Sequence, residues 1–275
     1  MKSFLGILCL CFSFSLSAQD FYIDVKMGFG QAISAGQAGY YYRGSFFNDQ
    51  DEFITDGFGE GLYLKSNFGY NYNSFLAFEF GFNFLKGQTV EFTHRSAFFA
   101  TSGIPGGGFY NHSQSINAFL FSPQLVFNVP NQSKIQPYAK VGIAISPFIK
   151  STVDAELNEL DSNDVYIKTI MKGGTPLGFT ASLGARYSIS KRLAIVADFD
   201  LLNMTYRPYK SVITEYIVDG DNRYENLSIS QRETLYISKR ESNGTPNDIN
   251  KPRELFPIML PMSNINFNLG LQFNL

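Results

Sequence analysis

The side chains that could perform chemistry in this chain are few, and they form no recognised catalytic motif. The only two histidines are His94 and His112. No serine or aspartate stands near either at a spacing that would assign a nucleophile or a general base, and a metal would need third and fourth ligands that the sequence does not indicate. We therefore expect no catalysis, no metal and no cofactor. A membrane-embedded enzyme that modifies lipids through one of these histidines is an alternative that this pattern disfavours.

Two acidic stretches carry oxygen ligands of the kind that Ca²⁺ prefers. They are DAELNELDSND at residues 154–164 and DGDN at residues 219–222. Neither has the twelve-residue spacing of a known calcium loop, so we interpret both as solvated loops and leave calcium binding open. The glycine-rich stretch at 103–108 lacks the Lys-Ser/Thr and the strand–helix context of a phosphate loop, and we predict a turn there.

Charged residues of a different kind lie inside segments where large apolar side chains occupy every second position. Four of them are acidic and four are basic, and each alternates with apolar neighbours. They are Asp24, Lys26, Lys65, Glu79, Lys140, Arg186, Asp198 and Asp200. What these side chains can do depends on the elements that carry them.

The segment 76–86 shows this alternation most clearly. Its even positions carry one leucine and four phenylalanines, and its odd positions carry alanine, glutamate, glycine and asparagine. A period of two places successive side chains on opposite faces of a strand. Seven other segments repeat the pattern, and the eight predicted strands are 21–33, 59–70, 76–86, 115–127, 137–150, 177–189, 193–201 and 263–275.

The connections between these strands alternate between long and short along the chain. The long ones are 34–58, 87–112, 151–176 and 207–261, and parts of the last (212–218 and 235–238) are predicted to extend the flanking strands. An even number of strands with long loops on one side and short turns on the other is typical of outer-membrane barrels. The sequence therefore predicts an all-β fold, an eight-stranded antiparallel up-and-down transmembrane β-barrel with long extracellular loops and short periplasmic turns.

The face that carries the charges separates this barrel from a soluble, lipocalin-like carrier, which would keep its apolar face inside. Here the charges share their face with glycine and asparagine, which lack the bulk to build a core. We therefore place the eight charged residues in the lumen, where balanced charges should pair and side chains should leave no open pore. A small-solute porin is the alternative. The lipid-facing set is predicted to include Phe78, Phe80, Phe82, Phe84, Phe267 and Phe273.

The first 18 residues read as a secretory signal peptide, with one lysine, an apolar run and small residues before a cleavage site after Ala18. Residues 19–275 would then form one barrel domain. Both cysteines, Cys9 and Cys11, lie in the first segment, so the exported chain would have no thiol chemistry. A net charge of −2 provides no basic surface for nucleic acid.

These segments resemble the small OmpA/OmpX-like outer-membrane barrels common in Bacteroidetes, whose relatives include PorT-like and porin-family proteins. The residues that carry the resemblance are the SAQ before the first strand, NSFLAFEFGFNFLKG, QPYAKVGIA and the alternating segment up to Leu275. Such barrels usually have an aromatic last residue, whereas the last three residues of this sequence are Phe273, Asn274 and Leu275.

The resemblance implies an outer-membrane location, contact with outer-membrane lipid and insertion by the barrel-assembly machinery. It also implies a non-enzymatic role in the cell envelope, either structural or through binding by the long loops. The partner would be an extracellular protein or, as in PorT-like relatives, a component of a protein secretion system.

Overall fold

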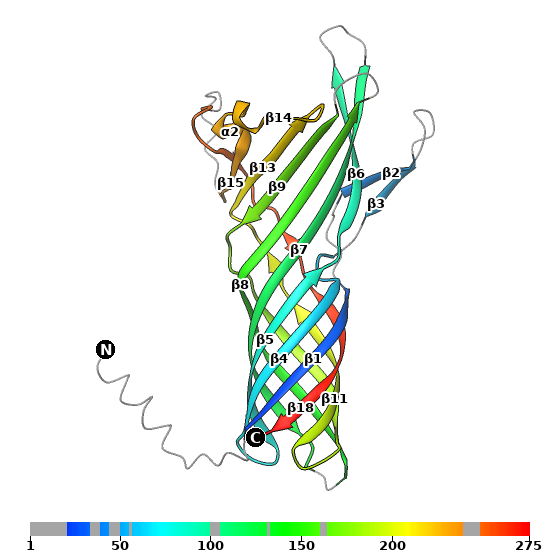
Figure 1. Cartoon of the computed structure of the whole chain (residues 1–275), viewed down its shortest axis with the longest axis vertical. Helices are drawn as coiled ribbons and strands as arrows, with labels where there is room; N and C mark the ends of the chain where they lie inside the picture. Colours follow the sequence, from blue (N-terminus) through cyan, green and yellow to red (C-terminus); the bar gives the residue numbers. More distant parts are fainter. Residues whose placement is uncertain are drawn as a thin grey trace, which may run out of the picture.

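A computed structural model describes residues 21–33, 39–43, 50–54, 57–99, 105–130, 133–159, 164–238 and 248–275, with the backbone alone for 39–43, 50–54, 92–99, 105–110 and 158–159. Eight antiparallel strands close into a barrel whose strands tilt against its long axis (Figure 1). Around the ring they are β1 (Phe21–Ala32), β4 (Gly61–Asn71), β5 (Leu76–Gly87), β7 (Pro105–Asn128), β8 (Ile135–Glu159), β10 (Leu177–Ser188), β11 (Leu193–Asn203) and β18 (Asn264–Asn274). All eight predicted strands are present, and the predicted fold class is confirmed.

The period-two pattern produces this barrel because each strand buries one face and exposes the other. In β4, buried and exposed positions alternate along almost the whole strand. Across strands the exposed aromatic residues pair with one another, as Phe82 does with Phe121 at 5.4 Å and Phe199 with Phe267 at 5.1 Å between ring centroids. Such aromatic pairs across strands stabilise the register.

The short connections between barrel strands lie at one end of the barrel, the end at which β18 terminates (Figure 1). We call this the turn end. Side chains of the type that favours tight turns cap two of them. Asn73 Oδ1 accepts hydrogen bonds from the backbone N–H groups of Phe75 and Leu76, and Ser190 Oγ accepts them from Arg192 and Leu193. These turns connect β4 to β5 and β10 to β11 in the predicted way.

At the opposite end, much of the chain predicted to form loops is β-structure. β6 (Val90–Phe99) pairs with residues 105–114 of β7, and β9 (Val165–Lys172) pairs with residues 151–157 of β8. β13 (Lys210–Val218), β14 (Asp221–Asn222), β15 (Glu233–Tyr236) and β16 (Arg253–Leu255) continue the sheet beyond β9. We call these strands, with the parts of β7 and β8 that pair with them and residues 248–258, the extension.

The extension differs from the sequence-based prediction in three details. Segment 212–218 lies in β13 and pairs with β9, whereas residues 235 and 236 lie in β15, which pairs with β13 and β16, so neither segment prolongs the strands β11 and β18. Residues 105–108, predicted to be part of a turn, are extended and pair with β6. The acidic stretch 154–164 is predicted to be a loop, but its residues 154–159 form the end of strand β8. Polar, glycine-rich sequence forms strands here because the long partners β7 and β8 provide a template for backbone hydrogen bonds.

The DGDN stretch, predicted to be a solvated loop, contains the tight turn between β13 and β14. Asp219 and Gly220 both have positive φ angles, 53° and 82°. This is the backbone of a two-residue hairpin turn that Asp-Gly favours. The Asp219 carboxylate also accepts a hydrogen bond from the backbone N–H of Asp164 at 3.1 Å, so it serves to hold two connections together.

The remaining described elements are small. β2 (Gly39–Arg43) pairs with β3 (Gln50–Ile54), β12 (Thr205–Tyr206) pairs with β17 (Leu260–Pro261), and η2 (Tyr224–Asn226) and α2 (Ile229–Arg232) are single helical turns. No helix in the part of the chain that the structure describes is long and apolar enough to cross a membrane. The predicted signal peptide lies outside the described residues.

Candidate functional site

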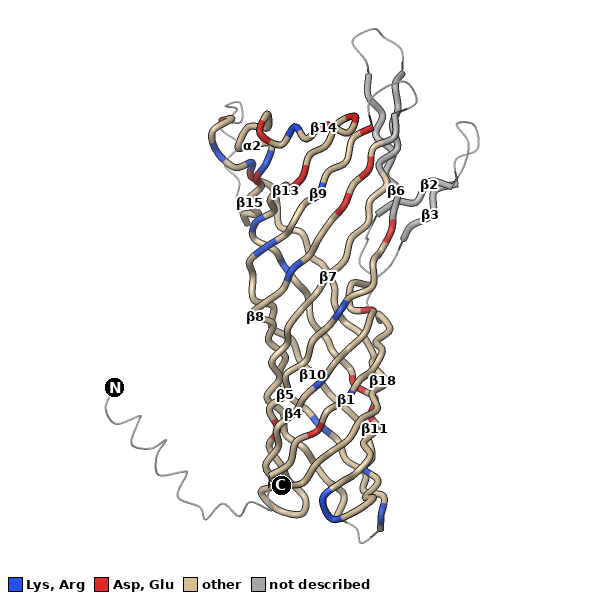
Figure 2. The backbone as a smooth tube through the Cα atoms, in the orientation of Figure 1, with Lys and Arg blue, Asp and Glu red and all other residues tan. Residues whose placement is uncertain are grey.

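The eight charged residues singled out in the sequence all lie inside the barrel, with exposed fractions between 0 and 7%. Six strands supply them, and on five of these strands the same face also carries glycine, serine or asparagine, whereas on β11 it carries alanine, valine and leucine. Figure 2 shows that the barrel wall is a mostly uncharged tube with isolated basic and acidic positions. The alternation of each strand therefore places all eight side chains within one enclosed space.

Three lysines bring the four carboxylates into one network. Lys140 Nζ lies 2.7 Å and 2.8 Å from the carboxylate oxygens of Glu79 and 3.5 Å from Asp24. Lys26 Nζ lies 2.6 Å from Asp198 and 3.9 Å from Asp24, and Lys65 pairs with Asp200. Because each of these three lysines and four carboxylates has an opposite charge beside it, the network reduces the cost of removing these seven groups from water.

Uncharged side chains complete this network, and the sequence analysis did not single them out. Tyr22 donates to Glu79 at 3.0 Å, and Tyr138 donates to Asp198 at 2.7 Å. The amide of Asn67 donates to Asp24, and that of Asn268 donates to Asp198 and Asp200. All four residues occupy the polar register of their strands, so the alternation itself was the signal that could have identified them.

Arg186 differs from the other seven charged residues because none of the carboxylates in the described part of the chain lies within ion-pair distance of it. Its Nη1 donates to Asn128 Oδ1 at 2.7 Å. Its guanidinium lies 4.5 Å from the ring centroid of Tyr138 and 5.3 Å from that of Tyr22, which are cation–π distances. Nε and Nη2 are both buried, and neither has a hydrogen-bond partner among the described residues.

The space left between these side chains is small. Two cavities lie beside Lys65, Asn83 and Asp200, and each measures about 20 Å³. A cavity of roughly 10–15 Å³ is the minimum for one water molecule, so each has room for a single water. The described side chains therefore fill this part of the lumen.

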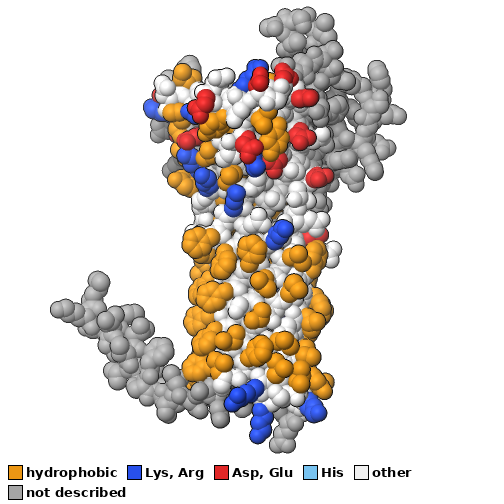
Figure 3. Space-filling model, in the orientation of Figure 1, with side chains coloured by type: hydrophobic (Ala, Val, Ile, Leu, Met, Phe, Trp, Pro, Cys, Tyr) orange, Lys and Arg blue, Asp and Glu red, His pale blue; other side chains and the backbone are white. Residues whose placement is uncertain are grey.

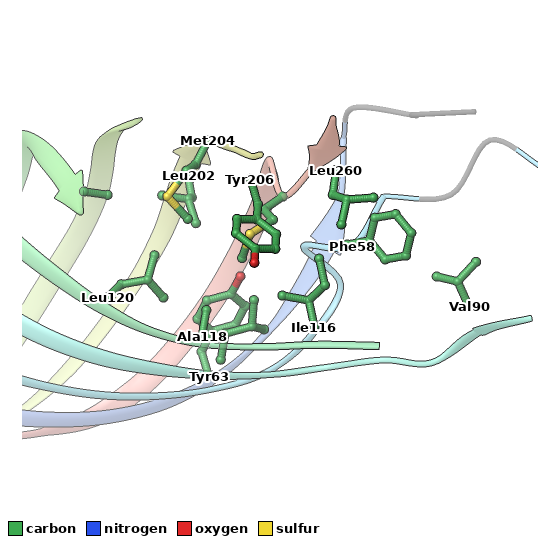
Figure 4. Packing of buried hydrophobic residues seen from close by; sticks show 13 residues of the cluster. Phe58, Tyr63, Val90, Ile116, Ala118, Leu120, Leu202, Met204, Tyr206 and Leu260 are labelled. Carbon is green, nitrogen blue, oxygen red and sulfur yellow. The ribbon is translucent and has the colours of Figure 1, made fainter. Parts of the chain in front are cut away.

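Above the ion pairs, toward the extension, apolar side chains fill the barrel. The cluster includes Tyr63, Leu85, Ile116, Leu202, Met204, Tyr206 and Met262, all at most 5% exposed. In Figure 4 the labelled side chains of this cluster project from several strands toward one another. Tyr63 anchors the layer, since its hydroxyl donates to the carbonyl of Gly59 at 3.1 Å and accepts from Asn264. The lumen thus has a charged lower part and an apolar upper part.

The six phenylalanines predicted to face lipid project outward, with exposed fractions between 41% and 50%. Exposed apolar side chains come from all eight barrel strands, and on the face seen in Figure 3 they form a band over the lower barrel with basic residues below it. We call this band the apolar belt. A continuous apolar surface of this size is unusual for a protein surrounded by water.

The two histidines lie on the paired strands β6 and β7. His94 is opposite Tyr110, and His112 is opposite Phe92 in the backbone register. The side chain of His94 lies outside the described part of the structure, and His112 is half-buried. Among the described residues no group of three or more His, Cys, Asp or Glu side chains could hold a metal ion.

Several solved structures are similar to this chain. Among solved structures, the chain is similar to neisserial surface protein A (11% identity, 94% of this chain and 98% of that one, TM-score 0.40) and to the outer membrane protein OprG from Pseudomonas aeruginosa (11%, 92% and 94%, 0.38). It is also similar to Ail, the attachment invasion locus protein of Yersinia pestis (9%, 92% and 98%, 0.30). No curated protein matches the chain.

The sequence profile of a protein family provides the stronger assignment. The profile described as the outer membrane protein beta-barrel domain matches residues 6–230, which is most of the chain. The match covers seven of the eight strands of the closed barrel, all except β18. The chain therefore belongs to the outer membrane protein β-barrel domain family and is a protein of the outer membrane.

Proposed function

We propose that this protein is a non-enzymatic outer-membrane barrel that binds a protein partner outside the cell through its extension and conducts no solute through its lumen. The filled lumen is the observation that carries the first part of the proposal, that no solute is conducted. A porin needs a continuous aqueous path, whereas here ion pairs occupy the lower lumen and an apolar cluster occupies the upper part. The apolar belt would contact lipid, and the turn end would face the periplasm.

The architecture of the extension supports a role in binding. It is a sheet continuous with the barrel wall, and ion pairs join neighbouring strands, with Lys168 3.0 Å from Glu215 and Lys210 2.9 Å from Glu233. Rigid scaffolds that present variable surfaces commonly carry binding. The partner would be an extracellular protein or a component of a protein secretion system.

Exposed apolar residues mark one edge of this surface. Ile249 is 62% exposed and Phe256 is 64% exposed. Their backbone segment is held in place, because the carbonyl of Ile249 accepts a hydrogen bond from Ser230 and that of Leu255 accepts one from Ile237. Large apolar side chains held at an exposed edge are typical anchors of protein interfaces.

The first test measures conductance. The purified barrel, reconstituted in planar bilayers beside a general porin as positive control, is expected to produce no current steps. Steady open-channel steps from the wild-type protein would overturn the statement that the lumen is closed and would restore the porin alternative.

The second test addresses the extension. Proximity labelling on intact cells should enrich a partner with the wild-type protein and lose it with the double variant Ile249→Ser/Phe256→Ser. Lys251→Ala is the matched control, since Lys251 lies between them and its side chain is 77% exposed. Equal labelling by wild type and double variant would contradict binding through this edge.

A further inference from the structure

A row of lysines crosses the outer surface of the sheet where the barrel passes into the extension. Lys86 of β5 is opposite Asn117 of β7, which is in turn opposite Lys150 of β8. The ladder between β8 and β9 begins at the adjacent residue of each strand, which places Lys150 beside Lys172 of β9. Lys172 is opposite Lys210 of β13. We call Lys86, Lys150, Lys172 and Lys210 the lysine row.

The lysine row lies on the face of the sheet that continues the apolar belt. Lys86 and Lys150 each follow an exposed phenylalanine by two residues, and a period of two keeps both side chains on one face of a strand. These phenylalanines are Phe84 and Phe148, and two residues of a strand span roughly 7 Å. On the opposite face of β8, Ile149 packs against the apolar cluster inside the barrel. The row therefore lies directly above the belt, where Figure 3 shows basic side chains.

Three of these lysines form no ion pair with a described residue. Lys86, Lys150 and Lys172 are exposed, and none of the carboxylates in the described part of the chain lies within ion-pair distance of them. Lys210 is paired, because its Nζ lies 2.9 Å from Glu233. Lys150, Lys172 and Lys210 occupy neighbouring strands, roughly 5 Å from one to the next, and like charges on directly opposite residues destabilise a sheet. An anion above the row would offset this repulsion.

The described acidic residues nearest to the row leave it positively charged. Asp154, farther up the extension, accepts a hydrogen bond from the Tyr166 hydroxyl. Glu215 is paired with Lys168 at 3.0 Å. Glu60 directly precedes β4 at one end of the row, beyond ion-pair distance of the lysines, so it offsets at most part of their charge. The surface between the apolar belt and the acidic part of the extension is therefore basic.

We propose that the lysine row binds the phosphate groups of anionic lipid in the membrane leaflet next to the extension. Lysine binds phosphate as a point charge, and basic residues beside a membrane attract anionic headgroups. The acyl chains would lie against Phe84 and Phe148, with the phosphates one step above them at Lys86 and Lys150. With the extension outside the cell, as proposed above, this is the outer leaflet. That assignment rests on the proposed orientation, whereas phosphate binding does not.

Native mass spectrometry tests this proposal by counting the lipids that the protein retains. The barrel with its extension is refolded in dodecyl maltoside and titrated with diphosphorylated lipid A and, separately, with the same lipid after both phosphates have been removed. Each lysine near an anionic surface contributes roughly fivefold in affinity, so the diphosphorylated lipid should bind at least about tenfold more tightly. Equal affinities would overturn the proposal. The result does not depend on whether the extension binds a protein partner, so this proposal and the proposed function fail separately.

Variants assign the preference to the lysine row. Lys86→Gln/Lys150→Gln/Lys172→Gln removes three exposed positive charges and should abolish the preference for the phosphorylated lipid, whereas arginine at the same three positions should keep it. Unchanged mobility of unboiled samples on a gel checks that each variant folds. A triple glutamine variant that folds and keeps the preference would overturn the assignment.

A matched control removes the same number of charges from the other side of the apolar belt. Lys134→Gln/Lys191→Gln/Arg192→Gln changes three exposed basic residues of the short connections at the turn end. This variant should retain the preference of the wild-type protein. An equal loss in both triple variants would show diffuse attraction to positive charge and would contradict a site at the lysine row.

Discussion

Replacing Lys140 by methionine should destabilise the barrel strongly, because it removes the cation that two buried carboxylates share. Lys140 Nζ lies 2.7 Å from Glu79 and 3.5 Å from Asp24, and both of these acids are at most 1% exposed. Removing one partner of a buried ion pair costs roughly 3–5 kcal/mol, since the remaining charge stays buried without compensation. Glu79 keeps its hydrogen bond from Tyr22, which offsets only part of that loss.

The assay is urea unfolding of the barrel in lipid vesicles. The chain has no tryptophan and 16 tyrosines, so unfolding is followed by tyrosine fluorescence and by circular dichroism, with the mobility of unboiled samples on a gel as a third probe. Lys140→Met should lower the free energy of unfolding by about 3–5 kcal/mol. The exposed Lys150 on the same strand provides the control, and Lys150→Met should change that free energy by less than about 0.5 kcal/mol.

A double variant sharpens this test. Lys140→Met/Glu79→Gln removes both charges of the Lys140–Glu79 pair, so most of the lost stability should return, because replacing a whole buried pair is often close to neutral. A single variant within about 1 kcal/mol of wild type would contradict the account of the lumen as a network of interdependent charges. A double variant as unstable as Lys140→Met alone would contradict it equally.

Three further predictions concern other parts of the chain. Phe82→Arg on the apolar belt should lower the free energy of unfolding in vesicles by about 2–4 kcal/mol if that face meets lipid near the bilayer centre, whereas Phe82→Leu should have a small effect. In the extension, the hydrogen bond from Tyr166 to Asp154 raises the pKa of the Tyr166 phenol above its usual value of 10, and burial adds to this. The stability that this hydrogen bond contributes is therefore fully present below pH 10 and declines as the pH rises further. In a ¹³C NMR titration, Asp154→Asn should return the pKa of the Tyr166 phenol toward 10. Mass spectrometry of the exported protein should find Gln19 as its first residue, and a chain that retains the segment up to Ala18 would contradict the predicted signal peptide.

Within the barrel, local sequence was a reliable guide because the membrane-spanning strands repeat one simple rule. Each alternates large apolar residues with small or polar ones, and lipid-exposed strands tolerate few departures from that rule. Even Pro123, which cannot donate a ladder hydrogen bond, lies close to an irregularity, since the register of β7 against β8 shifts between Phe119 and Phe121. A bulge is a place where strands accept proline.

The extension was harder to predict because its strands do not bury one continuous face. In β9 seven of eight residues are half-buried, so no clean alternation marks the strand. Its backbone hydrogen bonds are provided by β8, the strand directly before it in the chain, and by β13, whose paired residues lie much farther along. Pairing of that kind depends on partners brought close by the barrel, and composition alone favoured loops.

The sequence by itself determined the strand number, the strand positions and the set of charged residues that face inward, because all three follow from a period of two read along each strand. Only the tertiary structure decided which charges meet. Closing the ring brings β1 and β11 within reach across the lumen, so Lys26 pairs with Asp198 although 172 residues separate them. The same closure leaves Arg186 beside Tyr22, Tyr138 and Asn128 instead of a carboxylate, because partners within a barrel depend on register and ring order, which no single strand encodes.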